Sequence, residues 1–276
     1  MTDPIVLVAA FVIGACVGSF LNVCIARWPA NESVVAPRSR CPRCGHQITW
    51  LENIPIVSWL ALRARCRGCG QPISAIYPAV ELIVALGWLA AFAAFGPTFT
   101  ALRVAVFGTV LLGIFATDLR HYLIPDGFTV FGLAWGIVAA VVAVATGDPG
   151  PFAPPWDAFI GACAGAGAIA IAGWLGEVAL KKEAMGFGDV TLMAVVGAAL
   201  GPGRALLTIF IGALLGAVAF LAVVYPVVWL RSRRGGAPFE PPLVPFGVFL
   251  APAAMVTLLW GYALLDWYRA RAMVTG

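Results

Sequence analysis

Charged side chains are scarce in this chain. Only 11% of its 276 residues are Asp, Glu, Lys or Arg, whereas 62% are hydrophobic, and the mean hydropathy is +0.96. Soluble globular domains carry about 25% charged residues, so the composition excludes an ordinary soluble protein and predicts several membrane-spanning helices. The formal net charge of +4 is too small to indicate nucleic-acid binding.

The N-terminus also lacks the positive charge of a secretory signal. Residues 1–4 read Met-Thr-Asp-Pro, and the apolar run 5–26 that follows is long enough to cross a bilayer. We therefore expect a permanent first helix rather than a cleaved signal peptide. Histidine is equally rare, with two in the chain, and no His-Glu-x-x-His metal motif is present.

The apolar runs predict an all-α polytopic membrane protein with about eight transmembrane helices. The predicted spans are 5–26, 76–95, 101–117, 128–145, 159–180, 190–200, 205–230 and 248–265. The sixth, with 11 residues, is shorter than the roughly 20 that a spanning helix needs, so it either begins upstream of Asp189 or fails to cross. The third is also short, which would draw Asp118 toward the lipid.

The distribution of basic residues predicts the orientation. With the N-terminus outside, 13 of the 17 Lys and Arg residues fall in cytoplasmic segments. These are Arg27, Arg38, Arg40, Arg43, Arg63, Arg65, Arg67, Arg120, Lys181, Lys182, Arg231, Arg233 and Arg234. Both termini then lie outside, and Asp118 and Asp189 both lie at cytoplasmic ends of spans. A seven-span arrangement would keep the two together only if residues 190–200 re-enter the membrane rather than cross it.

Cysteine forms two Cys-x-x-Cys pairs in the one sizeable polar segment, residues 28–75. Cys41 and Cys44 make the first pair and Cys66 and Cys69 the second, with 21 residues between them. This pattern is typical of a structural zinc site with four thiolate ligands. A segment of this size gains from a metal because its own hydrophobic core is small. Four reduced thiols or a redox pair are the alternatives, and a reducing cytoplasm disfavours disulfides.

The stretch between the two cysteine pairs is apolar and contains Trp50 and Trp59. It is either the small core of this module or a surface that rests on the membrane, with both tryptophans at headgroup level. The sequence leaves both interpretations open. We expect three parts in the chain: a first transmembrane helix (1–27), the zinc-binding module (28–75) and a membrane-embedded domain (76–276).

Asp118 and Asp189 are the candidate catalytic residues. Ionisable groups at membrane depth are costly, and they are therefore functional candidates. Two carboxylates that share a proton can perform aspartic proteolysis, in which one activates water and the other polarises the scissile carbonyl. Gly186 and Gly188, beside Asp189, would let a substrate backbone approach. Alternatively both acids are interfacial helix-end residues, as we expect for Asp126, a predicted cap of the next helix.

Two other classes of function are compatible with these features. A proton-coupled carrier could use the same two aspartates as proton sites. A non-enzymatic membrane scaffold could use the zinc module to dock a partner, with the aspartates only capping helices.

Several motifs lie along almost the whole chain. They are 18–23 (Gly-Ser-Phe-Leu-Asn-Val), the two cysteine pairs, 53–60 (Asn-Ile-Pro-Ile-Val-Ser-Trp-Leu), 63–67 (Arg-Ala-Arg-Cys-Arg), 73–81 (Ile-Ser-Ala-Ile-Tyr-Pro-Ala-Val-Glu), 118–126 (Asp through Ile-Pro-Asp), 186–189 (Gly-Phe-Gly-Asp) and 245–247 (Pro-Phe-Gly). In this combination the chain resembles the bacterial type IV prepilin leader peptidases. These are Gly-x-Gly-Asp membrane aspartic proteases of pilus, type II secretion and competence systems.

The resemblance implies that Asp118 and Asp189 form the catalytic dyad of a multi-pass protein in the bacterial inner membrane, with the active site facing the cytoplasm. It implies cleavage of the basic leader of a prepilin or pseudopilin, ahead of the hydrophobic helix of that substrate. Many members then methylate the new N-terminus with S-adenosylmethionine, for which we assign no residues. Thr191 stands where family members usually have lysine, so this chain lacks a positive charge near Asp189.

Overall fold

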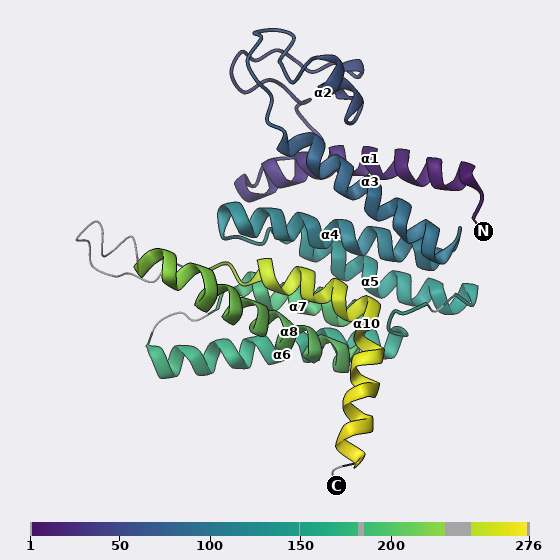
Figure 1. The fold of residues 1–276 in the computed structure, drawn as a ribbon, viewed down its shortest axis with the longest axis vertical. Helices are drawn as coiled ribbons and strands as arrows, with labels where there is room; N and C mark the ends of the chain where they lie inside the picture. Colours follow the sequence, from purple (N-terminus) through teal and green to yellow (C-terminus); the bar gives the residue numbers. More distant parts are fainter. Residues whose placement is uncertain (1, 149, 182–184, 230–243, 275–276) are drawn as a thin grey trace. The chain divides into compact units, whose positions relative to one another are not determined.

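The structure is a computed structural model that describes residues 2–148, 150–181, 185–229 and 244–274. Within these residues it is helical, with two isolated β-bridges and no strands, so the all-α prediction is confirmed (Figure 1). The long helices are α1 (Pro4–Arg27), α3 (Ile76–Phe95), α4 (Phe99–His121), α5 (Asp126–Thr146), α6 (Pro155–Leu180), α7 (Phe187–Leu200), α8 (Pro202–Ala219) and α10 (Gly247–Val274). The short ones are η1 (Trp28–Ala30), η2 (Leu51–Asn53), α2 (Val57–Ala61) and the π-helical turn η3 (Phe220–Val224).

Among the described residues, seven helices are long and apolar enough to cross a membrane. They are Pro4–Ala30, Ile76–Phe95, Phe99–His121, Asp126–Thr146, Pro155–Ala179, Pro202–Trp229 and Gly247–Arg271. The predicted sixth span is α7, which begins upstream of Asp189 but has only 14 residues. Its length of about 21 Å is less than the roughly 30 Å of bilayer hydrocarbon. The described part of the chain therefore contains seven helices of spanning length and one shorter apolar helix where eight spans were predicted.

Two local predictions are wrong. Helix α4 has 23 residues rather than a short span, and Asp118 lies inside its last turn. The helix continues because Arg120 and His121 suit the negative end of its dipole. Asp126 does not cap α5 but is its first residue, and the cap position is occupied by Pro125. Lys182, Leu230, Arg231, Arg233 and Arg234, which entered the span and orientation predictions, lie outside the described residues.

The chain divides into two compact units, Met1–Gly113 and Ile114–Gly276, with the boundary inside α4. In the first unit α1 packs closely on α3 through small residues. A Cβ atom at Gly18 would lie 2.7 Å from Cα of Glu81, and one at Gly14 would lie 2.8 Å from Cβ of Trp88. The cysteine module, whose short helix α2 is labelled in Figure 1, belongs to this unit and connects α1 to α3.

In the second unit the short helix α7 contacts α5, α6, α8 and α10. Its closest neighbour is α6, because the two backbones meet at glycines. A Cβ atom at Gly161 would lie 2.2 Å from the carbonyl oxygen of Gly197, and one at Gly165 would lie 2.3 Å from that of Met193. Small residues that let helix backbones approach are typical of packing in lipid. This packing fixes the position of α7, and with it that of Asp189.

Candidate active site and metal centre

Asp118 lies in a buried position of the second unit. Asp118 is 5% exposed. Its Oδ2 atom accepts a hydrogen bond of 3.1 Å from the backbone N–H of Val248, 130 positions along the chain. Val248 is the second residue of α10. The carboxyl group therefore meets the N-terminus of α10, where backbone N–H groups are free to donate and the helix dipole is positive.

Gly247 lies beside Asp118, and Ile124 packs against both Gly247 and Gly188. A Cβ atom at Gly247 would lie 2.8 Å from Oδ2 of Asp118 and 3.0 Å from Cδ1 of Ile124. A Cβ atom at Gly188 would lie 2.9 Å from Cβ of Ile124. Ile124, which is 6% exposed, thus packs against the start of α10 and the start of α7. Neither glycine has room for a side chain.

Asp189 is the third residue of α7 and is only partly exposed. Its N–H donates to the carbonyl oxygen of Gly186 at 3.1 Å, and its carboxyl group interacts electrostatically with that of Asp118. The structure therefore brings the two sequence-predicted acids into one site, each beside the N-terminus of a helix. The hydroxyl of Thr191 donates to the carbonyl oxygen of Gly188 at 3.0 Å, so it stabilises the same turn.

This arrangement can perform acid–base chemistry. Two interacting carboxyl groups can share one proton, so that one acts as the base and the other as the acid in the same reaction. Gly186, which is exposed, presents bare backbone near Asp189, whereas Ile124 covers Gly188. The positive ends of two helix dipoles reduce the cost of negative charge at this depth.

The four cysteines of the module form a compact cluster in the first unit. The Sγ atoms of Cys41, Cys44, Cys66 and Cys69 all lie within 4.8 Å of one another. The closest pairs are 44 with 66 at 3.9 Å and 41 with 69 at 4.0 Å. A tetrahedral site with Zn–S bonds of about 2.3 Å needs sulfur atoms about 3.8 Å apart. The four thiols could therefore hold a metal ion, and their geometry suits zinc.

Each cysteine pair sits in the same kind of turn. The N–H of Cys41 donates to the carbonyl oxygen of His46 and that of Cys66 to Gln71, both at 2.9 Å. Each turn then reverses at a glycine with positive φ, Gly45 at 73° and Gly70 at 68°, a conformation that glycine adopts without strain. The sequence contains this signal, because a glycine directly follows each second cysteine.

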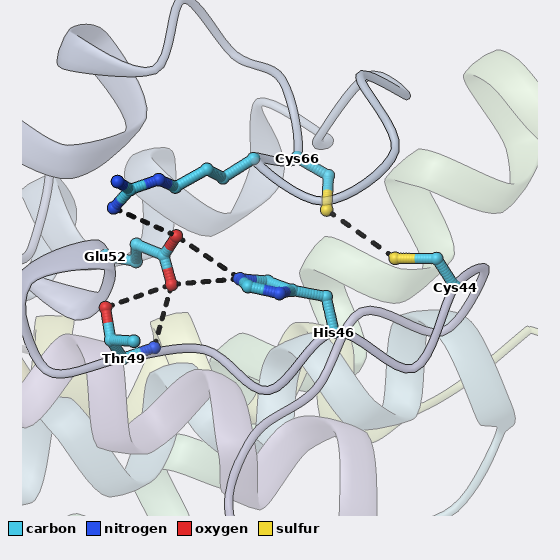
Figure 2. Close-up of polar contacts among 6 residues, drawn as sticks. Cys44, His46, Thr49, Glu52 and Cys66 are labelled. Atoms are coloured by element: carbon cyan, nitrogen blue, oxygen red, sulfur yellow. Dashed lines mark hydrogen bonds and ion pairs between the residues drawn. The ribbon is translucent and has the colours of Figure 1, made fainter.

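Sequence reasoning missed a polar cluster that joins the two turns (Figure 2). Glu52 accepts hydrogen bonds from the N–H and hydroxyl of Thr49, at 2.9 and 3.0 Å, and lies 3.2 Å from Nε2 of His46. Arg67 lies 3.8 Å away on the other side. The Glu52 side chain is only 6% exposed, and its pKa is lowered, chiefly because the Thr49 N–H donates to the carboxylate.

His46 belongs to this cluster rather than to the sulfur atoms. Its Nε2 faces Glu52, and its Cβ lies so close to Gly68 that a Cβ atom there would be only 2.8 Å away. His46 from the first turn thus packs on the second turn. Within the described residues, the candidate metal-binding group contains only the four cysteines.

Comparison with known proteins identifies the family. Residues 12–95 match the bacterial peptidase A24 N-terminal domain, and residues 105–221 match the type IV leader peptidase family. A protein of Myxococcus xanthus is 44% identical over 233 residues, which make up 84% of this chain and 66% of that protein. Proteins of Aeromonas hydrophila and Pseudomonas aeruginosa are each 36% identical; the first match covers 94% of this chain and 92% of that protein, the second 92% and 90%.

All three relatives are named prepilin leader peptidase/N-methyltransferase. No solved structure matches the chain. The coverage of the Aeromonas and Pseudomonas proteins is nearly complete in both directions, and the matched families include both the module and the aspartate-bearing helices α4 and α7. The chain therefore belongs to the type IV leader peptidase family.

Proposed function

We propose that this protein is a membrane aspartic endopeptidase that removes the basic leader peptide from prepilins or pseudopilins. The observation that carries the proposal is the shared site of Asp118 and Asp189, which interact with each other at the N-termini of α10 and α7. The relatives bear the name of this activity. A carrier or a scaffold would not need the exposed glycine backbone at Gly186, close to Asp189.

In the proposed reaction one carboxylate takes a proton from water while the water oxygen attacks the scissile carbonyl carbon. The other carboxyl group is protonated and donates a hydrogen bond to the carbonyl oxygen, where negative charge develops. The C–N bond then breaks, and the departing nitrogen receives a proton from the acid that first accepted it. Gly186 leaves space for the substrate backbone beside Asp189, whereas Ile124 fills the space beside Gly188.

The helices make this a multi-pass membrane protein, and we propose that the active site faces the cytoplasm of a bacterial inner membrane. A basic leader would then remain at the membrane surface while the hydrophobic helix of the substrate lies in lipid. We retain the proposed division into a first helix (1–27), a module (28–75) and a peptidase domain (76–276).

We propose a structural role for zinc in the module. Cys41, Cys44, Cys66 and Cys69 would supply all four ligands of a tetrahedral ion, which leaves no position for a substrate. The ion would connect the two turns and stabilise a segment with little core of its own.

The relatives are also named N-methyltransferases, and we propose the same second activity here. S-adenosylmethionine would supply a methyl group to the amine that cleavage releases. We assign no residues to its binding, and none of the described segments is a glycine-rich strand–turn–helix.

The test is to incubate the purified protein in nanodiscs with a prepilin that carries its leader, with and without S-adenosylmethionine, and to measure product masses. We expect leader loss in both samples and a methyl addition only with the cofactor. Asp118→Asn and Asp189→Asn should each reduce cleavage by about 10²–10⁴-fold.

Asp157→Asn is the matched control, because Asp157 is an exposed acid in the first turn of α6 and should not matter. Cleavage at the wild-type rate by either Asp118→Asn or Asp189→Asn would remove that residue from the proposed dyad.

A further inference from the structure

The module presents an apolar surface that its own core does not use. Five large hydrophobic side chains in residues 50–61 are exposed, and we call this set the outer face. They are Trp50 (71% exposed), Leu51 (53%), Ile54 (39%), Val57 (59%) and Leu60 (61%). All five belong to or adjoin the η2–α2 segment. A group of exposed large apolar side chains in one short segment is typical of an interaction surface.

The opposite side of the same segment is occupied within the module. The indole N–H of Trp59 donates to the carbonyl oxygen of Ile73 at 3.2 Å. Glu52 is held by Thr49, His46 and Arg67, as described above. The segment is therefore amphipathic, and of the two tryptophans only Trp50 lies on the outer face. The inner side anchors the segment, whereas the side chains of the outer face are exposed.

One contact ties the middle of this segment to a membrane helix. The N–H of Ile56 donates to Oε2 of Glu81 at 2.7 Å, and the hydroxyl of Ser19 on α1 also bonds this carboxyl group. Ile56 has φ 63° and ψ −51°, and Val57 N–H donates across it to Pro55, which is a γ-turn that a β-branched residue rarely adopts. The surrounding contacts hold the segment in this unfavourable conformation.

The position of Glu81 determines where the segment lies. Glu81 is the sixth residue of α3, about 8 Å along the helix axis from its start, and α3 is long and apolar enough to cross a membrane. Asn22 of α1 bonds the carbonyl oxygen of Tyr77, so the end of α1 and the start of α3 lie together. The η2–α2 segment is thus pinned at the membrane–water boundary of this helix pair.

The charge of the module indicates what kind of partner contacts the outer face. Six arginines in residues 28–75 are exposed, namely Arg38, Arg40, Arg43, Arg63, Arg65 and Arg67. The segment contains only two acids, Glu32 and Glu52, and Glu52 is already engaged. Arginines beside an exposed tryptophan and aliphatic side chains are typical of surfaces that bind anionic lipid. The same charge repels a basic leader peptide.

We infer that the outer face is an interfacial membrane anchor, in which Trp50, Leu51, Ile54, Val57 and Leu60 enter the headgroup region and neighbouring arginines bind anionic headgroups. The Glu81–Ile56 hydrogen bond sets the height of the segment. Because both ends of the module are attached to membrane helices, the anchor needs little affinity of its own to stay in contact with lipid.

The test uses the full chain in nanodiscs that contain anionic lipid with brominated acyl chains, since bromine quenches tryptophan emission only at close range. The difference in emission between wild type and the Trp50→Phe variant is the emission of Trp50 alone, and we call it the difference signal of Trp50. We expect brominated lipid to reduce this difference signal at least about two-fold relative to unbrominated lipid, consistent with a tryptophan at headgroup level. Trp59→Phe gives the internal control, and its difference signal should be quenched less.

The arginine contribution is tested with an Arg63→Gln, Arg65→Gln double variant. It should reduce quenching of Trp50 in anionic nanodiscs to the level seen with neutral lipid, while one metal ion per chain is retained. Equal Trp50 emission in brominated and unbrominated lipid would overturn the proposal. This holds whether Trp50 is then surrounded by water or covered by another protein surface. None of these readouts depends on peptidase activity.

Discussion

The cysteine module and the helical bundle that carries the aspartates position their polar groups by opposite means. In the module the four sulfur atoms come from turns at most 28 residues apart, and Cys44 and Cys69 remain exposed. In the bundle Asp118 is 5% exposed and bonds a backbone group 130 positions away. The module relies on local turns, polar contacts and a proposed metal, whereas the bundle relies on close backbone packing at glycines.

This difference predicts which substitutions each region tolerates. A packed interior has almost no room for added volume, so one extra methyl group destabilises the packing where helix backbones touch. A small exposed module depends instead on the ligand that joins its turns. The two regions should therefore fail independently of each other.

The largest effect is expected for Gly161→Ala. The new Cβ would lie 2.2 Å from the Gly197 carbonyl oxygen, so α6 and α7 must separate and Asp189 must move. We expect loss of nearly all cleavage and of a monodisperse gel-filtration peak, with chain-bound zinc retained. Gly167→Ala in the same helix has nothing within 4 Å and should keep full activity. Full activity of Gly161→Ala would contradict the packing argument.

The second-largest effect is expected for Gly247→Ala, which tests how α10 orients Asp118. In Gly247→Ala the added methyl group would lie 2.8 Å from Oδ2 of Asp118 and disturb its bond to Val248. We expect kcat to fall about 10–100-fold, since small misplacements of catalytic groups cost this much, with KM nearly unchanged. Gly203→Ala, whose nearest neighbour is 4.0 Å away, is the control. A change in KM alone would mean that Gly247 contacts substrate instead.

Removal of the metal should act on the other region only. We expect chelation, or the double substitution Cys41→Ser and Cys66→Ser, to abolish amide-exchange protection in residues 41–71. The protection lost should exceed about 100-fold, because structural zinc contributes much of the folding energy of small modules. Protection of α6 and α7 should stay unchanged. If those helices lose protection together with the module, the two regions are not independent.

The smallest effect is expected for Glu52→Gln, which keeps the shape of the polar cluster but removes its negative charge. Because the pKa of Glu52 is lowered in the folded module, its charge stabilises the module fully above the ordinary value of 4.5. This contribution is lost as the pH falls through the lowered pKa. The variant should release zinc to a chelator a few-fold faster than wild type at pH 7.

The difference between Glu52→Gln and wild type should begin to narrow below pH 4.5 and disappear as the pH falls through the lowered pKa, where the wild-type carboxylate becomes protonated. Glu32→Gln removes the same charge from an exposed site of the module and should match wild type throughout. A zinc-release rate for Glu52→Gln equal to that of the Glu32 variant at pH 7 would show that the cluster does not stabilise the module.

The sequence predicted those features that depend on short patterns. The predicted span 76–95 coincides with α3, because its apolar run has clear ends. The two cysteine pairs were predicted as one site from their spacing, and they form one cluster. Asp118 and Asp189 were chosen because acids are rare in apolar sequence, and the structure brings them together.

Other features depend on contacts that no short pattern encodes. The bond from Val248 to Asp118 joins two distant helices, and the bond from Ile56 to Glu81 joins the module to α3. The end of α4 was misjudged because Arg120 and His121 suit a helix end as well as a loop. Glu52 was overlooked even though Thr49 and His46 lie three and six positions from it, and only Arg67 is more distant in the sequence.

Ile124 has a consequence that reaches beyond packing. Its one side chain touches both Gly188, next to Asp189, and Gly247, next to Asp118. This aliphatic group therefore packs against a neighbour of each acid. Removing one methylene at position 124 would loosen the packing beside both acids without changing an ionisable residue. The two carboxyl groups could therefore be displaced by a substitution that is purely aliphatic.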